Sequence, residues 1–407
     1  MSRYALGGDV WQIVQAGTQL QIGGSSQRAV TRTFRTPEQA AAAHDKLVAE
    51  KLAAGYLPAA GDPRSAELEA AIAANPDDGD AYAIYADWLE REGDPRGPLI
   101  AAQIAGERAE RSGKRDKKID AAAAKLFAEH ADYFLGPLAE LAADAARDAD
   151  PTFVWRYGYL YKAYLHAERH QPIAARVAQL LAHPSARFLG ELALGGRSQD
   201  ANMQDAIGAL AARAPASLRA LRLWAAQKLE LGALWPALPE LRRLALAGQA
   251  IALGPIELPA LEKLSIVDSE LPHASARAIA CAPWPRLREL ELDFSTGYLT
   301  GDASIDDVFA LLARRDLPAL TRLALRHTRY IREVVIELAA SPLAAQLEQL
   351  DLSNNQMTDE HARALAAAGA RLPRLAALDV SANKLSPAGV AALAPLAPKL
   401  YAQRQTA

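Results

Sequence analysis

The chain has 407 residues, which is more than one ordinary compact core accommodates, so we expect two or three domains or one long repeat array with extensions. Lys and Arg number 45 against 48 Asp and Glu, and the resulting net charge of -3 gives no global field that would attract nucleic acid or an anionic membrane. The single cysteine, Cys281, excludes an intramolecular disulfide and a cysteine-based metal site, which favours a reducing compartment.

Targeting and membrane signals are not evident in the sequence. The first residues, MSRYALGGDVWQIV, have no basic region followed by a continuous apolar core. No run of about eighteen apolar residues without a charge occurs. We therefore expect a soluble, cytoplasmic protein.

Residues 1–60 have the pattern of a small α+β module. Residues 10–34 alternate in the manner of strands, with breaks at two glycine-containing pairs, and predict an antiparallel meander. Thr36 as a cap, proline at the first helical position and Gln39 at the third predict a helix that runs to about Ala54. This order of elements, and the stretch FRTPEQAAAAHDKLVAEKLAAGYLP, resembles the WGR module of poly(ADP-ribose) polymerases and some bacterial proteins.

Membership of the WGR family would imply binding to DNA ends, but the residues that give the family its name are replaced. Aligning Ile22-Gly23 with the family's hydrophobic-glycine pair places Gln19, Leu20 and Gln21 at the Trp-Gly-Arg positions. Affinity for phosphate comes from Lys and Arg, which these positions do not supply. We therefore favour a structural or protein-docking role for a degenerate WGR-like module, with DNA binding as the alternative.

Residues 61–150 predict a helical segment that begins after the linker sequence Gly61-Asp62-Pro63-Arg64. The run LEAAIAANPDDGDAYAIYADWLEREGDPRGPLIAAQIA resembles the repeat-companion domain that precedes leucine-rich repeats in large bacterial proteins, most clearly in its YADWLEREGDPRG core. That family implies no chemistry, so we expect its aromatic residues to pack and its aspartates to cap helices. The basic stretch at 106–118, GERAERSGKRDKK, has interleaved acids and no aromatic nearby for base stacking, which favours a solvated helix face over a nucleic-acid patch.

Residues 151–407 contain an internal repeat. The frame L-x-x-L-x-L recurs eight times at spacings of 20 to 33 residues. The copies start at Leu189, Leu218, Leu241, Leu261, Leu287, Leu320, Leu347 and Leu375. A ninth, degenerate copy is expected at Leu160. These copies resemble the leucine-rich repeats, and the longer ones resemble the ribonuclease-inhibitor-like subtype, which implies an α/β solenoid with parallel strands on its concave face and helices on its convex face.

The spacing between copies predicts the helices and the regularity of the turns. We expect helices over 201–213, 274–281, 304–314, 331–340, 358–371 and 387–395. In the two closing copies the strand is followed by Asn355 and Asn383, whose amides can bond buried backbone groups of neighbouring turns. Earlier copies place other residues there, among them Ser269, and the copies at Leu218 and Leu241 are short. We therefore expect looser turns and thinner helical coverage in the first half of the array.

Side chains alternate across a strand, so the third, fifth and seventh positions of each copy face outward on the concave sheet. Among them Trp224 is the kind of anchor that dominates protein interfaces, and Arg222 and Arg243 lie beside it, although a loop or another domain could cover it instead. Further along, Glu289, Glu291 and Asp293 face Lys263 on one side and Arg322 and Arg326 on the other. Cross-strand pairing accounts for most of this charge, and the alternative is that the acidic row and the insert at 295–307 receive a basic partner.

The sequence offers little support for an enzyme or a cofactor site. His166 and His170 have helical metal-ligand spacing, but no third ligand follows, and we expect His166 to end the degenerate first strand. No glycine-rich phosphate loop and no nucleophile with a supporting base is evident. We therefore predict a monomeric, non-enzymatic scaffold or adaptor that binds a protein partner on the concave repeat surface, without metal or cofactor. The alternative is a nucleic-acid-binding adaptor that acts through the WGR-like module.

Overall fold

The structure is a computed structural model that describes residues 2–6, 9–24, 30–54, 57–58, 64–114, 116–145, 153–167, 173–196, 202–294, 304–328 and 330–406. The chain divides into two compact units. One consists of Met1–Ala139 with Arg156–Tyr159, and the other consists of Glu140–Trp155 with Leu160–Ala407. The sequence-based boundary near residue 60, inside the first unit, stays a prediction.

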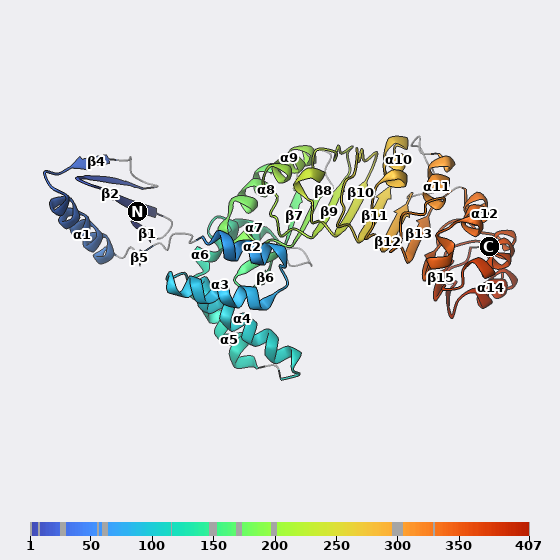
Figure 1. Ribbon diagram of the computed structural model, residues 1–407, viewed down its shortest axis with the longest axis horizontal. Helices are drawn as coiled ribbons and strands as arrows, with labels where there is room; N and C mark the ends of the chain where they lie inside the picture. The colour runs from blue at the N-terminus through green and yellow to red at the C-terminus, as the bar shows by residue number, and fades with distance from the viewer. Residues whose placement is uncertain are drawn as a thin grey trace. The chain divides into compact units, whose positions relative to one another are not determined.

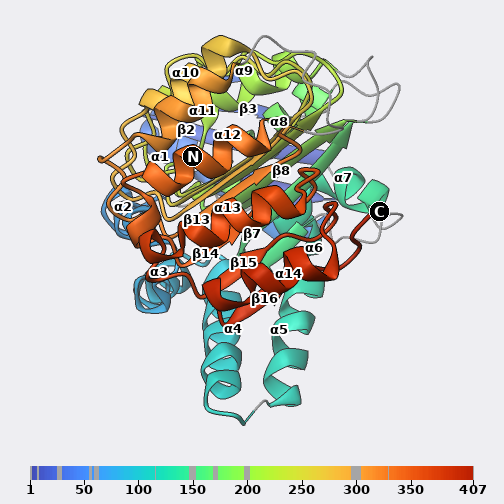
Figure 2. The ribbon, with the colours of Figure 1, turned by 90° about the vertical axis from the view of Figure 1, so that its right-hand side faces the viewer.

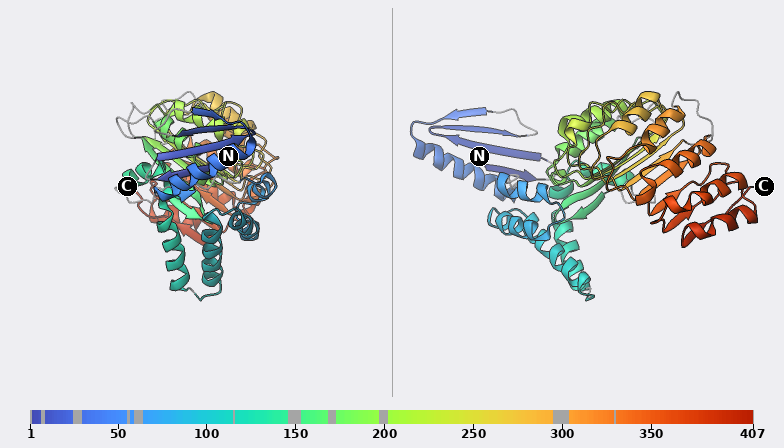
Figure 3. Two further views of the ribbon diagram at one scale, coloured as in Figure 1. Left: turned by 90° about the vertical axis from the view of Figure 1, so that its left-hand side faces the viewer. Right: turned by 45° about the vertical axis from the view of Figure 1, so that its right-hand side comes forward.

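The first unit begins with an antiparallel sheet whose strand order is β4-β3-β2-β1-β5. Its strands are β1 (Ser2–Leu6), β2 (Asp9–Ala16), β3 (Gln19–Gly24), β4 (Val30–Thr33) and β5 (Leu57–Pro58). Helix α1 (Pro37–Ala53) lies along one face (Figure 3), and the core between them contains Trp11, Ile13, Leu20 and Ala40, all buried. The predicted meander and helix are therefore confirmed, whereas β1 and β5 were not predicted.

The helices of the middle segment follow in chain order. They are α2 (Ala66–Ala74), α3 (Gly79–Arg91), α4 (Arg96–Arg111), α5 (Lys117–Glu129), α6 (Ala131–Leu135) and α7 (Leu138–Ala145). The basic stretch at 106–118 spans the end of α4, the turn and the start of α5, and these two helices form an antiparallel pair (Figure 2). Where described, its basic side chains are exposed or partly exposed, as expected for a solvated helix face.

The GDPRG end of the companion-like motif forms the corner between α3 and α4. Asp94 accepts a hydrogen bond at 2.8 Å from the backbone N–H of Arg96, the first residue of α4. The Arg96 side chain is buried, donates to the Tyr133 hydroxyl at 2.6 Å and lies 3.4 Å from the Asp94 carboxylate. A Cβ at Gly97 would lie 2.7 Å from the Glu90 backbone nitrogen, so only glycine permits this close helix crossing. The motif therefore has a structural function.

The second unit is a solenoid built on the greater part of an 11-stranded sheet whose strands follow chain order from β6 to β16 (Figure 1). The strands are β6 (Phe153–Arg156), β7 (Tyr159–Ala167), β8 (Glu191–Gly196), β9 (Ala220–Ala225), β10 (Arg243–Gly248), β11 (Lys263–Asp268), β12 (Glu289–Asp293), β13 (Arg322–Arg326), β14 (Gln349–Asp351), β15 (Ala377–Asp379) and β16 (Lys399–Tyr401). From β7 to β16 every neighbouring pair is parallel.

The repeat frame sets the register of this sheet. The fourth residue of each copy pairs with its counterpart in the next strand, as Leu244 does with Leu221 and Leu264, and these leucines are buried. Burial of one face favours this register, because a slip by one residue would expose the whole leucine row. The predicted alternation between inward and outward residues is therefore confirmed.

Helices line the side of the sheet that is opposite to its outward residues (Figures 1 and 3). They are α8 (Ile173–Ala182), α9 (Met203–Arg213), α10 (His273–Cys281), α11 (Ile305–Leu312), α12 (Ile331–Ala340), α13 (Asp359–Ala367) and α14 (Pro387–Leu393). All six predicted helices are present. Helix α8 and strands β6 and β16 were not predicted, and neither of these strands has the complete L-x-x-L-x-L frame.

The short copies have thin coverage, as expected. Between β9 and β10 the connection forms only a 3₁₀ turn, Trp235–Ala237, and the described residues between β10 and β11 form no helix. Trp235 fills the space that a helix would occupy: it is fully buried, and its indole N–H donates to the Leu253 carbonyl at 2.8 Å.

Asparagines satisfy the turns at the C-terminal end. The buried Asn355 amide donates to the Leu325 carbonyl at 2.6 Å and accepts from the Thr328 N–H at 2.7 Å. Asn383 accepts from the N–H groups of Asn355 and Met357, both at 2.9 Å. Each side chain thus bonds backbone groups of the preceding turn, which repeats the arrangement from copy to copy.

In the fourth copy a different residue satisfies the turn. The sequence frame places Ser269 at the asparagine position, but the buried carboxylate of Asp268 makes the bonds, accepting from the N–H groups of Ala250, Ile251 and Glu270 at 2.8 to 2.9 Å. Burial raises the pKa of Asp268, although the three backbone donors favour its ionised form.

Candidate functional site

The outward side chains of the concave sheet form three rows that cross the strands. The register joins Lys162, Glu191, Ala220, Arg243, Lys263, Glu289, Arg322 and Gln349 in the first row. The second row contains Tyr164, Ala193, Arg222, Ala245, Ser265, Glu291, Ala324 and Asp351, and the third contains His166, Gly195, Trp224, Ala247, Val267, Asp293 and Arg326. We call the outward residues of β7–β10 the aromatic half and those of β11–β14 the charged half.

In the charged half, carboxylates and cations neutralise one another across the strands. The Lys263 ammonium lies 2.8 Å from Glu289 and 3.3 Å from Glu291, and Arg322 lies 3.4 Å from Glu289. Burial alone would raise the pKa of Glu289, but the hydrogen bond and charge of Lys263, together with Arg322, hold it below its ordinary value. Burial alone would lower the pKa of Lys263, but the hydrogen bonds and charges of Glu289 and Glu291 raise it above its ordinary value.

The third row of the charged half is paired in the same way. Arg326 contacts the Asp351 carboxylate at 2.7 Å, and this pairing raises the arginine's pKa in spite of burial. His327, just beyond β13, hydrogen-bonds Asp293 through Nδ1 at 2.8 Å. The acidic residues therefore have partners within the sheet, which favours the cross-strand interpretation of their charge over a surface that awaits a basic partner.

The aromatic half has a cluster of rings at its N-terminal edge. Trp224 is partly buried, and its ring centroid lies 6.3 Å from that of His166. The Tyr164 hydroxyl is hydrogen-bonded to His166 Nδ1 at 3.1 Å. Gly195 separates the rings: a Cβ there would lie 3.2 Å from the Tyr164 hydroxyl and 3.3 Å from Cε3 of Trp224. A side chain at this position would therefore press on the cluster, and glycine leaves room for the tryptophan.

The arginines of the aromatic half differ in their surroundings. Arg243 lies 2.5 Å from the Glu191 carboxylate, which Lys162 approaches at 3.8 Å from the other side. Arg222 is exposed, its cross-strand neighbours are Ala193 and Ala245, and no described residue forms an ion pair or hydrogen bond with its guanidinium. An exposed arginine between two alanines can therefore bond a carboxylate from outside the sheet.

The structure thus brings the predicted residues together in two groups. Arg222, Trp224 and Arg243 lie on two adjacent strands, and Lys263, Glu289, Glu291, Asp293 and Arg326 belong to the paired network. The sequence interpretation missed the contribution of Tyr164 and Gly195 to the tryptophan's surroundings. The frame starting at Leu160 places Lys162, Tyr164 and His166 outward, so the degenerate copy carried that signal. His166 lies on strand β7, which removes the helical spacing, and His170 lies outside the described residues.

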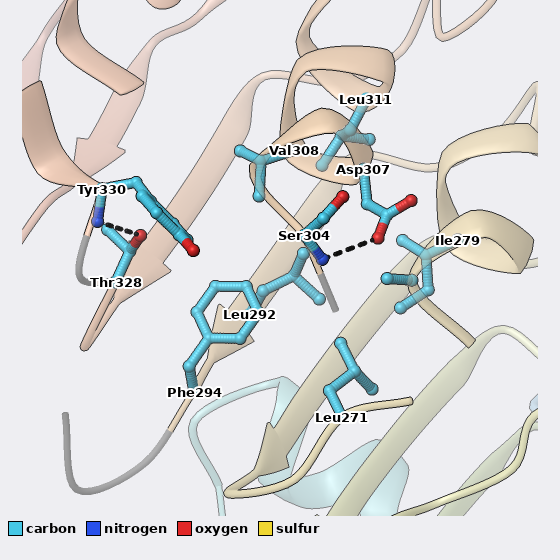
Figure 4. Close-up of a pocket in the computed structure, with 11 residues that line it drawn as sticks. Leu271, Ile279, Leu292, Phe294, Ser304, Asp307, Val308, Leu311, Thr328 and Tyr330 are labelled. Atoms are coloured by element: carbon cyan, nitrogen blue, oxygen red, sulfur yellow. Dashed lines mark hydrogen bonds between the residues drawn. The ribbon is translucent and has the colours of Figure 1, made fainter. Parts of the chain in front are cut away.

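A small apolar hollow lies between α10, the start of α11 and the residues just after β12 and β13, Phe294 and Thr328 (Figure 4). Leu271, Ile279, Leu292, Phe294 and Val308 are among its lining residues, with the buried Asp307. Asp307 Oδ2 accepts hydrogen bonds from the Ser304 N–H at 3.0 Å and from His273 Nδ1 at 2.8 Å, and so completes a capping box on α11. Asp307 Oδ1 is buried without a hydrogen bond from the described residues.

The WGR-like positions in the first unit do not form a cationic surface. Leu20 is fully buried in the core of the module, and Gln19 and Gln21 are exposed. The Lys51 ammonium lies over the ring of Trp11, 5.6 Å from its centroid. The residues at the three name-giving positions therefore offer a phosphate no charge.

Other kinds of site find no support in the described ranges. No group of three or more His, Cys, Asp or Glu residues within them could hold a metal ion. No helix that the structure describes is both long and apolar enough to span a bilayer.

A parallel sheet with one L-x-x-L-x-L strand per copy and helices on its other side defines the second unit as a leucine-rich-repeat-like solenoid. A Bacteroides fragilis protein solved by a structural genomics consortium is similar at 15% identity and a TM-score of 0.50, covering 98% of this chain and 95% of that one. An internalin from Listeria monocytogenes matches at 14% identity and a TM-score of 0.22, covering 65% of this chain and 94% of that one. At 15% identity the likeness to the Bacteroides fragilis protein shows the fold alone. No family model and no curated protein matches the sequence.

Proposed function

We propose that this chain is a non-enzymatic scaffold or adaptor that holds a protein partner on the aromatic half of its concave sheet. The observation that carries the proposal is Trp224, a tryptophan in an outward position of the sheet with an exposed arginine two residues away. Tryptophan and arginine are the side chains most enriched among interface anchors. A sheet that only faces water would do better with Ser, Thr or Lys at this position.

The surroundings of Trp224 support the same proposal. His166 and Gly195 adjoin its ring on one side, which restricts the orientations that the ring can take before a partner arrives. A preorganised aromatic side chain loses little conformational entropy on binding. The neighbouring outward residues Ala220, Ala245 and Ala247 are small, and between them Arg222 is exposed and Trp224 is partly exposed.

We also propose that the regions preceding the solenoid have a structural or protein-docking role rather than one in binding nucleic acid. The helical segment is assigned as a repeat-companion domain on its YADWLEREGDPRG motif, which forms the α3–α4 corner. Residues 1–60 are assigned as a degenerate WGR-like module. The exposed glutamines and the buried Leu20 at its name-giving positions support a structural or docking role.

The test is capture by the immobilised full chain from a lysate of the source cell, with mass-spectrometric identification, run with and without nuclease. The wild-type chain is compared with Trp224→Ala/Arg222→Glu and with a matched control in the charged half, Glu289→Gln/Arg322→Gln. We expect at least one protein to be retained by the wild-type chain and by the control, and to be lost with the first variant. Each substitution in that variant should cost about 2 kcal/mol or more of binding free energy.

Thermal denaturation of the same variants separates binding from folding. If Trp224→Ala/Arg222→Glu unfolds at an unchanged temperature but captures the same proteins as the wild-type chain, the proposed face is wrong. If it unfolds much earlier than the control, Trp224 packs against the chain itself, and the proposal fails for that reason. Loss of capture upon nuclease treatment would favour the nucleic-acid alternative.

A further inference from the structure

Arg222 differs from the other outward cations near it. Arg243 and Lys263 lie on the next two strands, and both contact carboxylates of neighbouring strands. Arg222 has alanines as both cross-strand neighbours, so the ladder supplies no carboxylate, and the described residues give its guanidinium no other bond. Arginine is a planar donor suited to bidentate contact with a carboxylate. Among the described residues, nothing therefore occupies the guanidinium of Arg222, which can bind an anion.

Charge is distributed unevenly over the two halves of the face. The outward residues of the aromatic half include three basic residues and one acidic residue, namely Lys162, Arg222, Arg243 and Glu191. The charged half contains three basic and four acidic outward residues, which contact one another. A locally positive surface in a chain of net charge -3 favours an acidic partner segment, because complementary charge accelerates encounter and excludes basic competitors.

An apolar contact lies at a fixed distance from this cation. Trp224 is two residues after Arg222 on the same strand and the same face, which places their Cα atoms about 6.7 Å apart. Residues i and i+2 of an extended segment have the same spacing, and residues i and i+4 of a helix are about 6 Å apart. A segment with an acidic residue and a large apolar residue at either spacing can therefore bond Arg222 and cover Trp224 simultaneously.

We propose that the partner presents an acidic segment whose carboxylate bonds Arg222 and whose large apolar side chain packs on Trp224, while Arg243 stays paired with Glu191 at the rim. This inference rests on the proposed function, because it specifies the partner of the same face. It assigns unequal roles to the two arginines, since only Arg222 has to receive a carboxylate from outside. The asymmetry can be measured.

The experiment is selection of a displayed random dodecapeptide library on the full chain, with enriched peptides synthesised and titrated by fluorescence anisotropy. We expect enrichment of Asp or Glu two or four positions from Trp, Phe, Leu or Ile. Arg222→Gln should weaken these peptides by about thirtyfold or more, as for an anchor residue. Arg243→Gln should weaken them less than about fivefold, as for a rim charge. Raising the salt concentration should weaken wild-type binding more than binding to Arg222→Gln.

The outcomes separate this inference from the proposed function. If the selected peptides are neutral or basic and their binding depends on Trp224 but not on Arg222, the proposal of an acidic partner segment is wrong. The proposed binding face is then still supported. The inference is equally wrong if Arg243→Gln weakens acidic peptides as much as Arg222→Gln does. Peptides that bind independently of both Trp224 and Arg222, or an empty selection, count against both proposals. A mixed-sequence single-stranded DNA that binds through Arg222 more tightly than any selected peptide also overturns both.

Discussion

The two halves of the concave sheet are both built from parallel strands with buried leucines, yet their outward side chains differ in kind. In the charged half the carboxylates Glu289, Glu291 and Asp351 contact cations one strand away. In the aromatic half, partly buried rings surround Gly195, and Arg222 lies exposed between alanines. The number of charged residues alone therefore does not identify a binding face. An exposed arginine to which the described residues offer no ion pair, beside a partly buried tryptophan, is the more informative signal.

Substitutions in the two halves should have very different effects on binding, and this is the largest effect that we expect. Trp224→Ala and Arg222→Glu should each weaken a captured protein partner by about 2 kcal/mol or more. The substitution Lys263→Gln in the charged half should change the partner's affinity by less than about 0.5 kcal/mol, because solvent screens partly exposed ion pairs. Isothermal titration with the purified partner measures both. Equal losses in the two halves would mean that the partner covers the whole face.

The regular turns beneath the C-terminal strands should carry more stability than the outward charges. Asn355→Ala leaves the Leu325 carbonyl and the Thr328 N–H without their partner and should cost about 1 to 3 kcal/mol of unfolding free energy. Gln349→Ala, an exposed outward position on β14, serves as the control and should have almost no effect. Urea denaturation followed by circular dichroism gives both values. An unchanged midpoint for Asn355→Ala would contradict the bonding described above.

The position of the Trp224 ring can be tested through Gly195, its cross-strand neighbour on β8. Gly195→Ala introduces a Cβ 3.3 Å from the ring and should displace it, at a cost of about 1 kcal/mol in stability. Partner affinity should fall by about five- to tenfold, in line with a preorganised anchor. Gly208 on α9 is the matched control, since a Cβ there meets no atom within 4 Å. Wild-type affinity for Gly195→Ala would mean that the ring's position does not matter for binding.

The smallest expected effect concerns the pH dependence of the charged half. Because the pKa of Glu289 is lowered in the folded chain, its pairs with Lys263 and Arg322 stabilise the fold above the ordinary glutamate pKa. This contribution is lost as the pH falls through the lowered value. Glu289→Gln should therefore destabilise the chain by about 0.5 kcal/mol or less at pH 7. The difference between variant and wild type should shrink toward pH 3 and in 1 M salt, and denaturation midpoints at several pH values measure it.

The repeat frame determined much of the solenoid directly. Leucines at fixed positions can be buried only if each copy forms a strand in one register, so the sequence predicted eight strands, six helices and the outward rows. Asn355 and Asn383 were recognisable because the pattern repeats around them. Where the frame is incomplete, as in β6 and β16, the local pattern could not distinguish a strand from a loop.

Tertiary structure decided which outward residues have partners. The sequence placed Arg222 and Arg243 side by side as equals, but the ion pair of Arg243 with Glu191 joins strands that are 52 residues apart in the chain. The ring cluster likewise combines Tyr164, Gly195 and Trp224 from three copies, and Asp268 takes over from Ser269 in bonding a turn. A repeat pattern sets the direction of each side chain, because that depends on local backbone geometry alone. The hydrogen bonds and ion pairs that each side chain forms depend on neighbouring residues, which the stacking of the copies brings together.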